Sequence, residues 1–173
     1  YSTDANSQNI NRLVHKSLID FNEKMQFVCK ACVTFSEKNI GPKQILTFKL
    51  RQDLTFSDGT VVTAEDVKRS WLYFAKNQNI KSTFMDAFET IEAINIIDKF
   101  NFEIVFSSFS LENFSNLSLL KIVKLTDLSL KSSGPIDPID VLGCGDYVLT
   151  TILPLEIVVT PKDKTKLTFV FKI

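Results

Sequence analysis

Leu46–Ser70, LTFKLRQDLTFSDGTVVTAEDVKRS, determines the fold prediction, because it combines the signals for a strand, a turn and a helix start. Apolar and polar side chains alternate over Ile45–Arg51, which is typical of a strand that buries one face. Ser57–Thr60 follows with turn chemistry, since Gly59 can adopt a positive φ. The stretch therefore predicts a one-sided strand that leads into a tight surface turn.

A helix start comes directly after this turn. Thr63 can cap the helix, and Asp66 can reach back as a variant of the capping box. We expect the helix to run from about Ala64 to Asn77. Its inward stripe should consist of Val67, Ser70, Trp71 and Phe74. The three apolar members of this stripe should pack with Phe48 and Leu50 of the preceding strand.

The hydrophobic pattern elsewhere predicts a mixture of helices and strands. We expect further helices over 6–21 and 111–120. We expect strands over 27–36, 91–98, 102–107, 119–125, 147–152, 156–160 and 167–173. A break at 39–42 should separate the first of these strands from the strand over Ile45–Arg51. Residues 132–140 contain Gly134, Pro135 and Pro138, which favours an irregular surface connection. The chain is therefore expected to have an α+β fold.

The composition excludes several classes of protein. The chain has 173 residues, of which 45% are hydrophobic and 23% charged, as in ordinary globular domains. Twenty basic residues balance twenty acidic ones without a basic cluster, so nucleic acid is not an expected partner. No apolar run reaches the ~18 to 20 residues needed to cross a bilayer, and no signal peptide opens the chain. We expect a mature or trimmed segment.

The three cysteines, Cys29, Cys32 and Cys144, allow at most one internal disulfide, and their number does not decide the compartment. Cys29 and Cys32 have the spacing of a redox or zinc motif, but the second ligand pair of a zinc site is missing. They also fall in a strand-like segment rather than at a helix start. We expect small buried residues or a disulfide there, and no metal or other cofactor.

No catalytic constellation is visible in the sequence. His15 is the only histidine and lies in the first predicted helix, without a nucleophile motif near it. Asp58 and the pair Glu65 and Asp66 have sufficient local roles in the turn and the cap. Gly143–Gly145 is too short for a phosphate-binding loop and suits a tight turn instead. The sequence therefore favours a protein that is not an enzyme.

Leu46–Ser70 resembles the strand, turn and capped helix that are the signature of the peptide and nickel branch of the extracellular solute-binding proteins. Asn11–Leu18 is similar to the first helix of that family, and 91–106 resembles its next hairpin. Gly143–Tyr147 is similar to the Gly-x-Gly-Pro-Tyr turn of the family, except that Asp146 replaces the proline. The resemblance extends over nearly the whole chain.

The resemblance implies the N-terminal lobe of a type II periplasmic-binding-protein-like clamshell, with residues 1–173 as a single lobe and the second lobe absent. It implies a peptide or another small solute as ligand and the membrane subunits of an ABC importer as partner. The protein would be a monomer without a cofactor, at the periplasmic or extracellular face of the membrane and lipid-anchored. The alternative is the ligand-sensing lobe of a regulator or signalling receptor with the same fold.

The resemblance also implies where the solute binds. The loop before the first helix and the Gly-x-Gly turn lie near the boundary between the lobes in the resembled family, and loops commonly carry binding residues. The expected ligand-binding residues are Thr3, Asp4, Gly143, Cys144, Gly145 and Tyr147. Most other contacts would come from the absent lobe.

Overall fold

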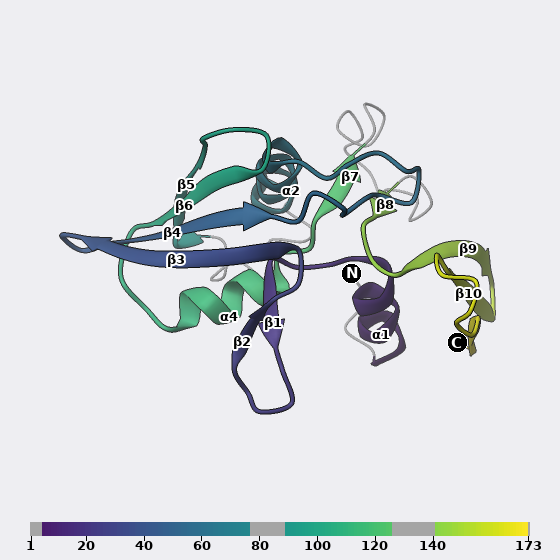
Figure 1. The fold of residues 1–173 in the computed structure, drawn as a ribbon. Coiled ribbons are helices and arrows are strands. Elements are labelled where there is room, and N and C mark those ends of the chain that lie inside the picture. The colour runs from purple at the N-terminus through teal and green to yellow at the C-terminus, as the bar shows by residue number, and fades with distance from the viewer. Residues whose placement is uncertain (1–4, 77–88, 126–140, 173) are drawn as a thin grey trace. The chain divides into compact units, whose positions relative to one another are not determined.

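The computed structural model describes residues 5–76, 89–125 and 141–172 and has the expected α+β fold. Its helices are α1 (Ala5–Val14), α2 (Ala64–Lys76) and α4 (Glu112–Leu119). Its strands are β1 (Ile19–Phe21), β2 (Phe27–Cys29), β3 (Cys32–Ile40), β4 (Lys43–Leu50), β5 (Ile91–Ile96), β6 (Asn101–Phe106), β7 (Val123–Leu125), β8 (Val141–Gly143), β9 (Tyr147–Leu153), β10 (Glu156–Pro161) and β11 (Phe169–Lys172) (Figure 1). Among these residues no helix is long and apolar enough to cross a membrane.

The chain forms two compact units, each built from segments that are separate in sequence. The first contains residues 1–16, 55–60 and 123–173. The second contains residues 17–54 and 61–122. The chain therefore passes from one unit to the other at four points, after residues 16, 54, 60 and 122.

The second unit is organised around an antiparallel sheet with the strand order β3-β4-β6-β5, which Figure 1 shows side by side. In β6 the side chains of Phe102, Ile104 and Phe106 are fully buried and alternate with partly exposed ones, as the pattern predicts. Phe48 of β4 stacks on Phe102, with 5.5 Å between the ring centroids. The sheet thus buries one aromatic-rich face.

The capping box of α2 is confirmed. The backbone N of Thr63 donates to Asp66 Oδ2 at 2.9 Å, and the backbone N of Asp66 donates to Thr63 Oγ1 at 3.4 Å. Val67 and Phe74 are buried as expected, but Trp71 is only partly buried. Ser70 is the fully buried polar member of the stripe, and its hydroxyl donates to the carbonyl of Asp66 at 2.7 Å.

The helix predicted over 6–21 is wrong in its second half, because α1 ends at Val14 and residues 19–21 form β1. β1 pairs with β2, and the carbonyl of Leu18 accepts a hydrogen bond from the backbone N of Lys30 at 2.9 Å. Leu18 is fully buried. Pairing with a distant segment therefore overrides the helical spacing of Leu18 with the residues before it.

The predicted break at 39–42 is narrower in the structure. β3 continues through Asn39 to Ile40, and only Gly41 and Pro42 separate it from β4. Gly41 has φ 58°, a conformation in which a side chain is unfavourable. The segment predicted as an irregular connection, 132–140, lies outside the described residues.

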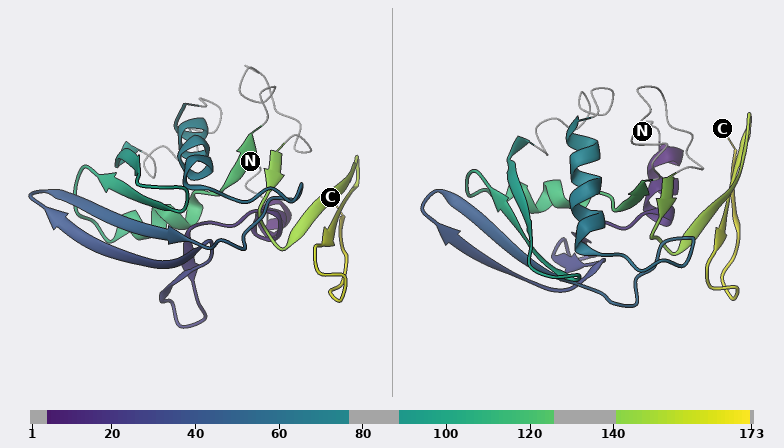
Figure 2. Two further views of the ribbon diagram at one scale, coloured as in Figure 1. Left: turned by 45° about the horizontal axis from the view of Figure 1, so that its top comes forward. Right: turned by 90° about the horizontal axis from the view of Figure 1, so that it is seen from above.

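The first unit contains α1, the pair β7–β8, the loop 55–60 and a three-stranded antiparallel sheet with the order β11-β10-β9. This sheet is the narrow ribbon at the yellow end of the chain in Figure 2. The buried side chains of Ile10, Val14, Tyr147 and Val159 join α1 to β9 and β10. The three C-terminal strands are confirmed, and α1 packs on one face of their sheet.

Candidate functional site

The turn from Gly143 to Tyr147 packs against the end of α1. The backbone N of Gly145 donates to the carbonyl of Val14 at 2.7 Å, which satisfies one of the carbonyls left open at the end of the helix. The backbone N of Ser57 donates to the carbonyl of Gly143 at 3.0 Å. Backbone contacts thus hold the turn between α1 and the loop 55–60.

Both glycines of this turn are required because a side chain would not fit there, and not because the backbone has a positive φ. A Cβ at Gly143 would lie 2.0 Å from the carbonyl oxygen of Val14, and one at Gly145 would lie 2.1 Å from that of Leu13. Neither glycine has a positive φ. Close approach of the backbone at the end of α1 therefore explains both glycines.

The structure places four of the predicted ligand-binding residues, Gly143, Cys144, Gly145 and Tyr147, in one turn. Cys144 is buried, and burial raises the pKa of its thiol. Tyr147 is 8% exposed and belongs to the core beside α1. Thr3 and Asp4 lie outside the described residues. The role of all six in binding remains a prediction.

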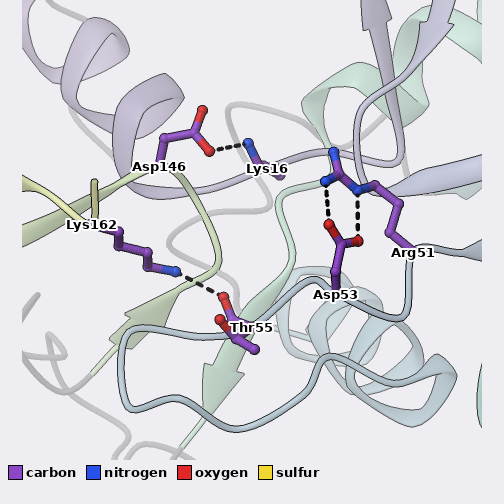
Figure 3. Close-up of polar contacts among 6 residues, drawn as sticks. All are labelled: Lys16, Arg51, Asp53, Thr55, Asp146 and Lys162. Carbon is purple, nitrogen blue, oxygen red and sulfur yellow. Dashed lines mark hydrogen bonds and ion pairs between the residues drawn. The ribbon is translucent and has the colours of Figure 1, made fainter. Parts of the chain in front are cut away.

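Sequence reasoning missed the charged groups that surround this turn. Lys16 Nζ donates to Asp146 Oδ1 at 2.7 Å, and the Lys16 side chain is 19% exposed while that of Asp146 is 59% exposed (Figure 3). Desolvation opposes ionisation of Asp146, but the hydrogen bond from Lys16 and the charges of nearby lysines outweigh it, so its pKa lies below the usual value. Asp146 was the signal in the sequence that could have indicated a charged site, because it is a charged residue at the position where the resembled family has proline.

Lys162, which follows β10, also reaches the loop 55–60. Its Nζ donates to the backbone carbonyl of Thr55 at 2.8 Å, over 107 positions in sequence (Figure 3). Desolvation lowers the pKa of this ammonium group, because it disfavours the charge, although the residue as a whole is exposed. Lys162 was not among the residues expected at the site.

A further ion pair holds the loop 55–60 to β7. Lys124 Nζ donates to Asp58 Oδ2 at 2.5 Å and to Thr60 Oγ1 at 2.9 Å. The hydrogen bond from Lys124 is the largest cause that lowers the pKa of Asp58 to about 2. The predicted turn role of Asp58 is confirmed, since its Oδ1 accepts a hydrogen bond from the backbone N of Thr60 at 3.0 Å.

The second unit has an ion pair of its own, between Arg51 and Asp53. The guanidinium donates through Nε at 3.1 Å and Nη2 at 2.7 Å to the two carboxylate oxygens (Figure 3). This bidentate pair follows the end of β4.

Two cysteines of the three form a disulfide, Cys29–Cys32, which joins the end of β2 to the start of β3. This is one of the two outcomes expected for the motif, and Cys144 is the free, buried cysteine. His15 follows α1 rather than lying within it, and is partly buried. Over residues 5–76, 89–125 and 141–172 no three His, Cys, Asp or Glu side chains are grouped as metal ligands would be.

Comparison with known proteins establishes the family. The sequence model of the bacterial extracellular solute-binding proteins, family 5 middle region, matches residues 36–165. The match covers most of the chain and includes the signature stretch, most of the four-stranded sheet and the glycine turn. The chain therefore belongs to family 5 of the bacterial extracellular solute-binding proteins, a class of binding proteins rather than of enzymes.

Solved structures show the same fold. NikZ from Campylobacter jejuni, in complex with Ni(L-His), has a TM-score of 0.77 at 20% identity, over 93% of this chain and 34% of its own. The oligopeptide-binding protein AppA from Bacillus subtilis, in complex with a nonapeptide, has 0.76 at 16%, over 95% and 33%. NikA from Brucella suis, in complex with Fe(III)-EDTA, has 0.78 at 20%, over 99% and 35%.

The chain spans about a third of the length of these structures. A search of curated proteins finds no match. The comparisons therefore establish the family and the fold of this chain, and the fold agrees with that expected from Leu46–Ser70.

Proposed function

We propose that this chain is one lobe of the solute-binding component of an ABC importer, and that it captures a peptide or another small solute against a second lobe. The observation that carries the proposal is the family match over residues 36–165. The fold shared with an oligopeptide-binding protein and two metal-chelate complexes supports it. Closure of two lobes by a hinge is the mechanism that such a binding protein would use.

The solute would lie at the edge of the first unit, beside the turn 143–147. Thr3 and Asp4 would contribute from the loop before α1, and Gly143, Cys144, Gly145 and Tyr147 from the turn. Backbone hydrogen bonds hold Gly143 to the loop 55–60 and Gly145 to α1, which supports a role of the turn as scaffold for a site. Buried Cys144 and Tyr147 would shape the site more than they contact the solute.

The protein would act outside the cytoplasmic membrane, in the periplasm or at the cell surface, held by a lipid anchor. The disulfide Cys29–Cys32 supports this location, because such bonds persist in oxidising compartments. It would work as a monomer without catalytic activity and would deliver the solute to the membrane subunits of the importer. NikZ and NikA were solved with metal chelates and AppA with a nonapeptide, which supports a small solute or a peptide as the ligand.

Calorimetric titration of a peptide library tests this function. The full-length protein with both lobes should bind a subset of peptides with a heat of binding that saturates. The 173-residue chain alone should show little or none, because a half-open site leaves the solute solvated and offers little gain over the entropy cost of association. Equally tight binding by the isolated chain would contradict the two-lobe mechanism, and no binding by the full-length protein would contradict peptide capture.

A further inference from the structure

The disulfide Cys29–Cys32 encloses a short loop, residues 29–32, whose backbone is bonded to two other segments of the chain. The backbone N of Ala31 donates to the carbonyl of Ser17 at 3.1 Å, and the carbonyl of Ala31 accepts a hydrogen bond from the backbone N of Arg51 at 3.0 Å. Ser17 also forms an isolated antiparallel bridge with Lys121. These backbone contacts form one continuous row with Ala31 and Ser17 at its centre.

This row lies where the chain enters and leaves the second unit. The chain passes between the units after residues 16, 54 and 122, and residues 17, 51 and 121 of the row lie within three positions of these points (54 − 51 = 3). Ser17 is 2% exposed and Ala31 is fully buried, so water does not compete for their hydrogen bonds. All of these contacts are within the second unit, and they fasten three of its four crossing points to one another.

The disulfide restrains the loop, whereas other contacts hold the hairpin beside it. β1 and β2 are paired along their length, and the ring of Phe27 contacts that of Phe114 at 5.3 Å. A disulfide that closes so short a loop also restricts the unfolded chain only a little. Loss of the bond should therefore leave the fold in place and weaken the backbone contacts of residues 29–32.

The two sulfur atoms of the bond differ in their surroundings. Cys29 is partly exposed, whereas Cys32 is 3% exposed. Cys32 Sγ lies 3.3 Å from the carbonyl oxygen of Leu18, which is positioned to accept a hydrogen bond from a free thiol. An attacking thiolate would therefore reach Cys29 first, and the released Cys32 would have a partner for its thiol hydrogen.

We propose that Cys29–Cys32 is a site of reversible thiol–disulfide exchange, at which a dithiol reduces the bond and thereby loosens the row of backbone contacts at the crossing points. Residues 29–32 lie between two strands, without the helix start that activates the cysteines of a redox catalyst. The chain is thus the substrate of the exchange and not its catalyst. This proposal does not depend on the proposed solute-binding function.

The exchange has two steps. A thiolate of the dithiol attacks Cys29 Sγ, forms a mixed disulfide with it and releases Cys32, which takes up a proton. The second thiol of the reductant, as its thiolate, then displaces Cys29, which also takes up a proton. The two cysteines gain two electrons and two protons, and the dithiol is oxidised to a disulfide. An oxidant of the opposite kind, a disulfide, restores the bond by the reverse steps.

Hydrogen exchange measured by NMR on the 173-residue chain, oxidised and reduced with dithiothreitol without denaturant, tests the proposal. Mass spectrometry after alkylation should show two more modified cysteines in the reduced chain. The amides of Ala31 and Arg51 should then exchange about tenfold faster, because their hydrogen bonds open more often. The amide of Leu50 is the matched control, since it donates to the carbonyl of Phe100 at 2.8 Å and not to the disulfide loop. Its exchange rate should not change.

Variants separate the bond from the reagent and locate the point of attack. In the double variant Cys29→Ser, Cys32→Ser, both test amides should exchange as in the reduced wild type, with or without dithiothreitol. Cys29 in the variant Cys32→Ser should react with dithiobis(nitrobenzoate) about tenfold faster than Cys32 in the variant Cys29→Ser, because Cys29 is more accessible. Buried Cys144 is present in both single variants and gives the same background.

Unchanged exchange at Ala31 and Arg51 after reduction, or a bond that dithiothreitol reduces only in denaturant, would overturn the proposal. Equal acceleration at Leu50 would also contradict it, because the bond would then support the whole sheet and not the row. Faster reaction at Cys32 would overturn the assigned point of attack. If the double variant does not fold, the reduced wild type still decides between these results.

Discussion

At the residue scale, glycines in this chain serve two different physical purposes. Gly145 lacks space for a side chain, since a Cβ would lie 2.1 Å from the carbonyl oxygen of Leu13. Gly59 has open space around it but a φ of 83°. A side chain at Gly145 would force the backbone of α1 to move. A side chain at Gly59 fits in the available space and only has to adopt a left-handed backbone conformation, which Asn adopts readily.

We therefore predict that Gly145→Ala lowers the free energy of unfolding by about 2 kcal/mol or more, as overpacking against backbone does. Gly59→Asn should lower it by only a few tenths of a kcal/mol. Urea denaturation of both variants measures the difference. Similar losses for the two variants would mean that the turn 143–147 is not packed against α1.

Asp58 gives a pH-dependent prediction at the same scale. Its pKa of about 2 lies below the ordinary value of 3.8, so the unfolded chain binds the proton more readily. The stability from the pair with Lys124 is thus fully present above about pH 4 and is lost as the pH falls through about 2. Asp58→Asn should cost about 1 kcal/mol near neutral pH, after allowance for solvent screening.

Urea denaturation of both proteins over this pH range provides the measurement for Asp58. The difference in unfolding free energy between wild type and Asp58→Asn should shrink towards about pH 2. A difference that stays constant across the range would contradict the proposed cause, because it would not depend on ionisation of the carboxyl group.

At the element scale, the disulfide ties the hairpin β1–β2 to the large sheet of the second unit. The rings of Phe21 and Phe27 meet across the hairpin in a tilted arrangement, with 4.5 Å between their centroids, and the ring of Phe27 contacts that of Phe114 in α4 at 5.3 Å. These contacts and the covalent bond between Cys29 and Cys32 act at opposite ends of the hairpin. The hairpin is therefore held at its base and along its face.

We predict that the double variant Cys29→Ser, Cys32→Ser unfolds with a free energy about 2 kcal/mol lower than that of the wild type, since closing so short a loop removes little chain entropy. Thermal and urea denaturation with and without a reducing agent measure this. The reducing agent should destabilise the wild type and have no effect on the double variant. A loss of more than about 5 kcal/mol would mean that the bond does more than restrict the unfolded chain.

At the scale of the whole molecule, the hydrophobic core is divided unequally between the two units. Of the twelve largest fully buried side chains among the described residues, only Phe56 belongs to the first unit. The second unit holds the others, and its segments 17–54 and 61–122 are joined by the short loop 55–60. The first unit depends on segments from both ends of the chain.

We predict that a fragment of residues 17–122 folds by itself, because it contains one complete sheet and nearly all of the fully buried aromatic and aliphatic side chains. It should show a cooperative thermal transition and the near-ultraviolet signal of ordered aromatic rings. A fragment of residues 123–173 should remain unfolded, since it lacks α1 and the loop 55–60. A fragment 17–122 without a cooperative transition would contradict this division.

The sequence alone determined the features whose physical cause is local. The alternation of Phe102, Ile104 and Phe106 predicts which face of β6 is buried, because successive side chains of a strand point to opposite faces. Thr63 and Asp66 mark the start of α2, because both partners of the capping box lie within one helical turn. The signature stretch around them was sufficient to predict the family.

Only the tertiary structure decided the features that depend on partners far away in the chain. Leu18 lies outside the first helix because its carbonyl accepts a hydrogen bond from the backbone N of Lys30. Lys162 belongs to the candidate site because its ammonium group donates to the carbonyl of Thr55. The space limit at Gly145 likewise comes from the end of α1. Local periodicity indicates which side chains prefer to be buried. It does not indicate which distant backbone groups will contact them, because those contacts depend on how the whole chain packs.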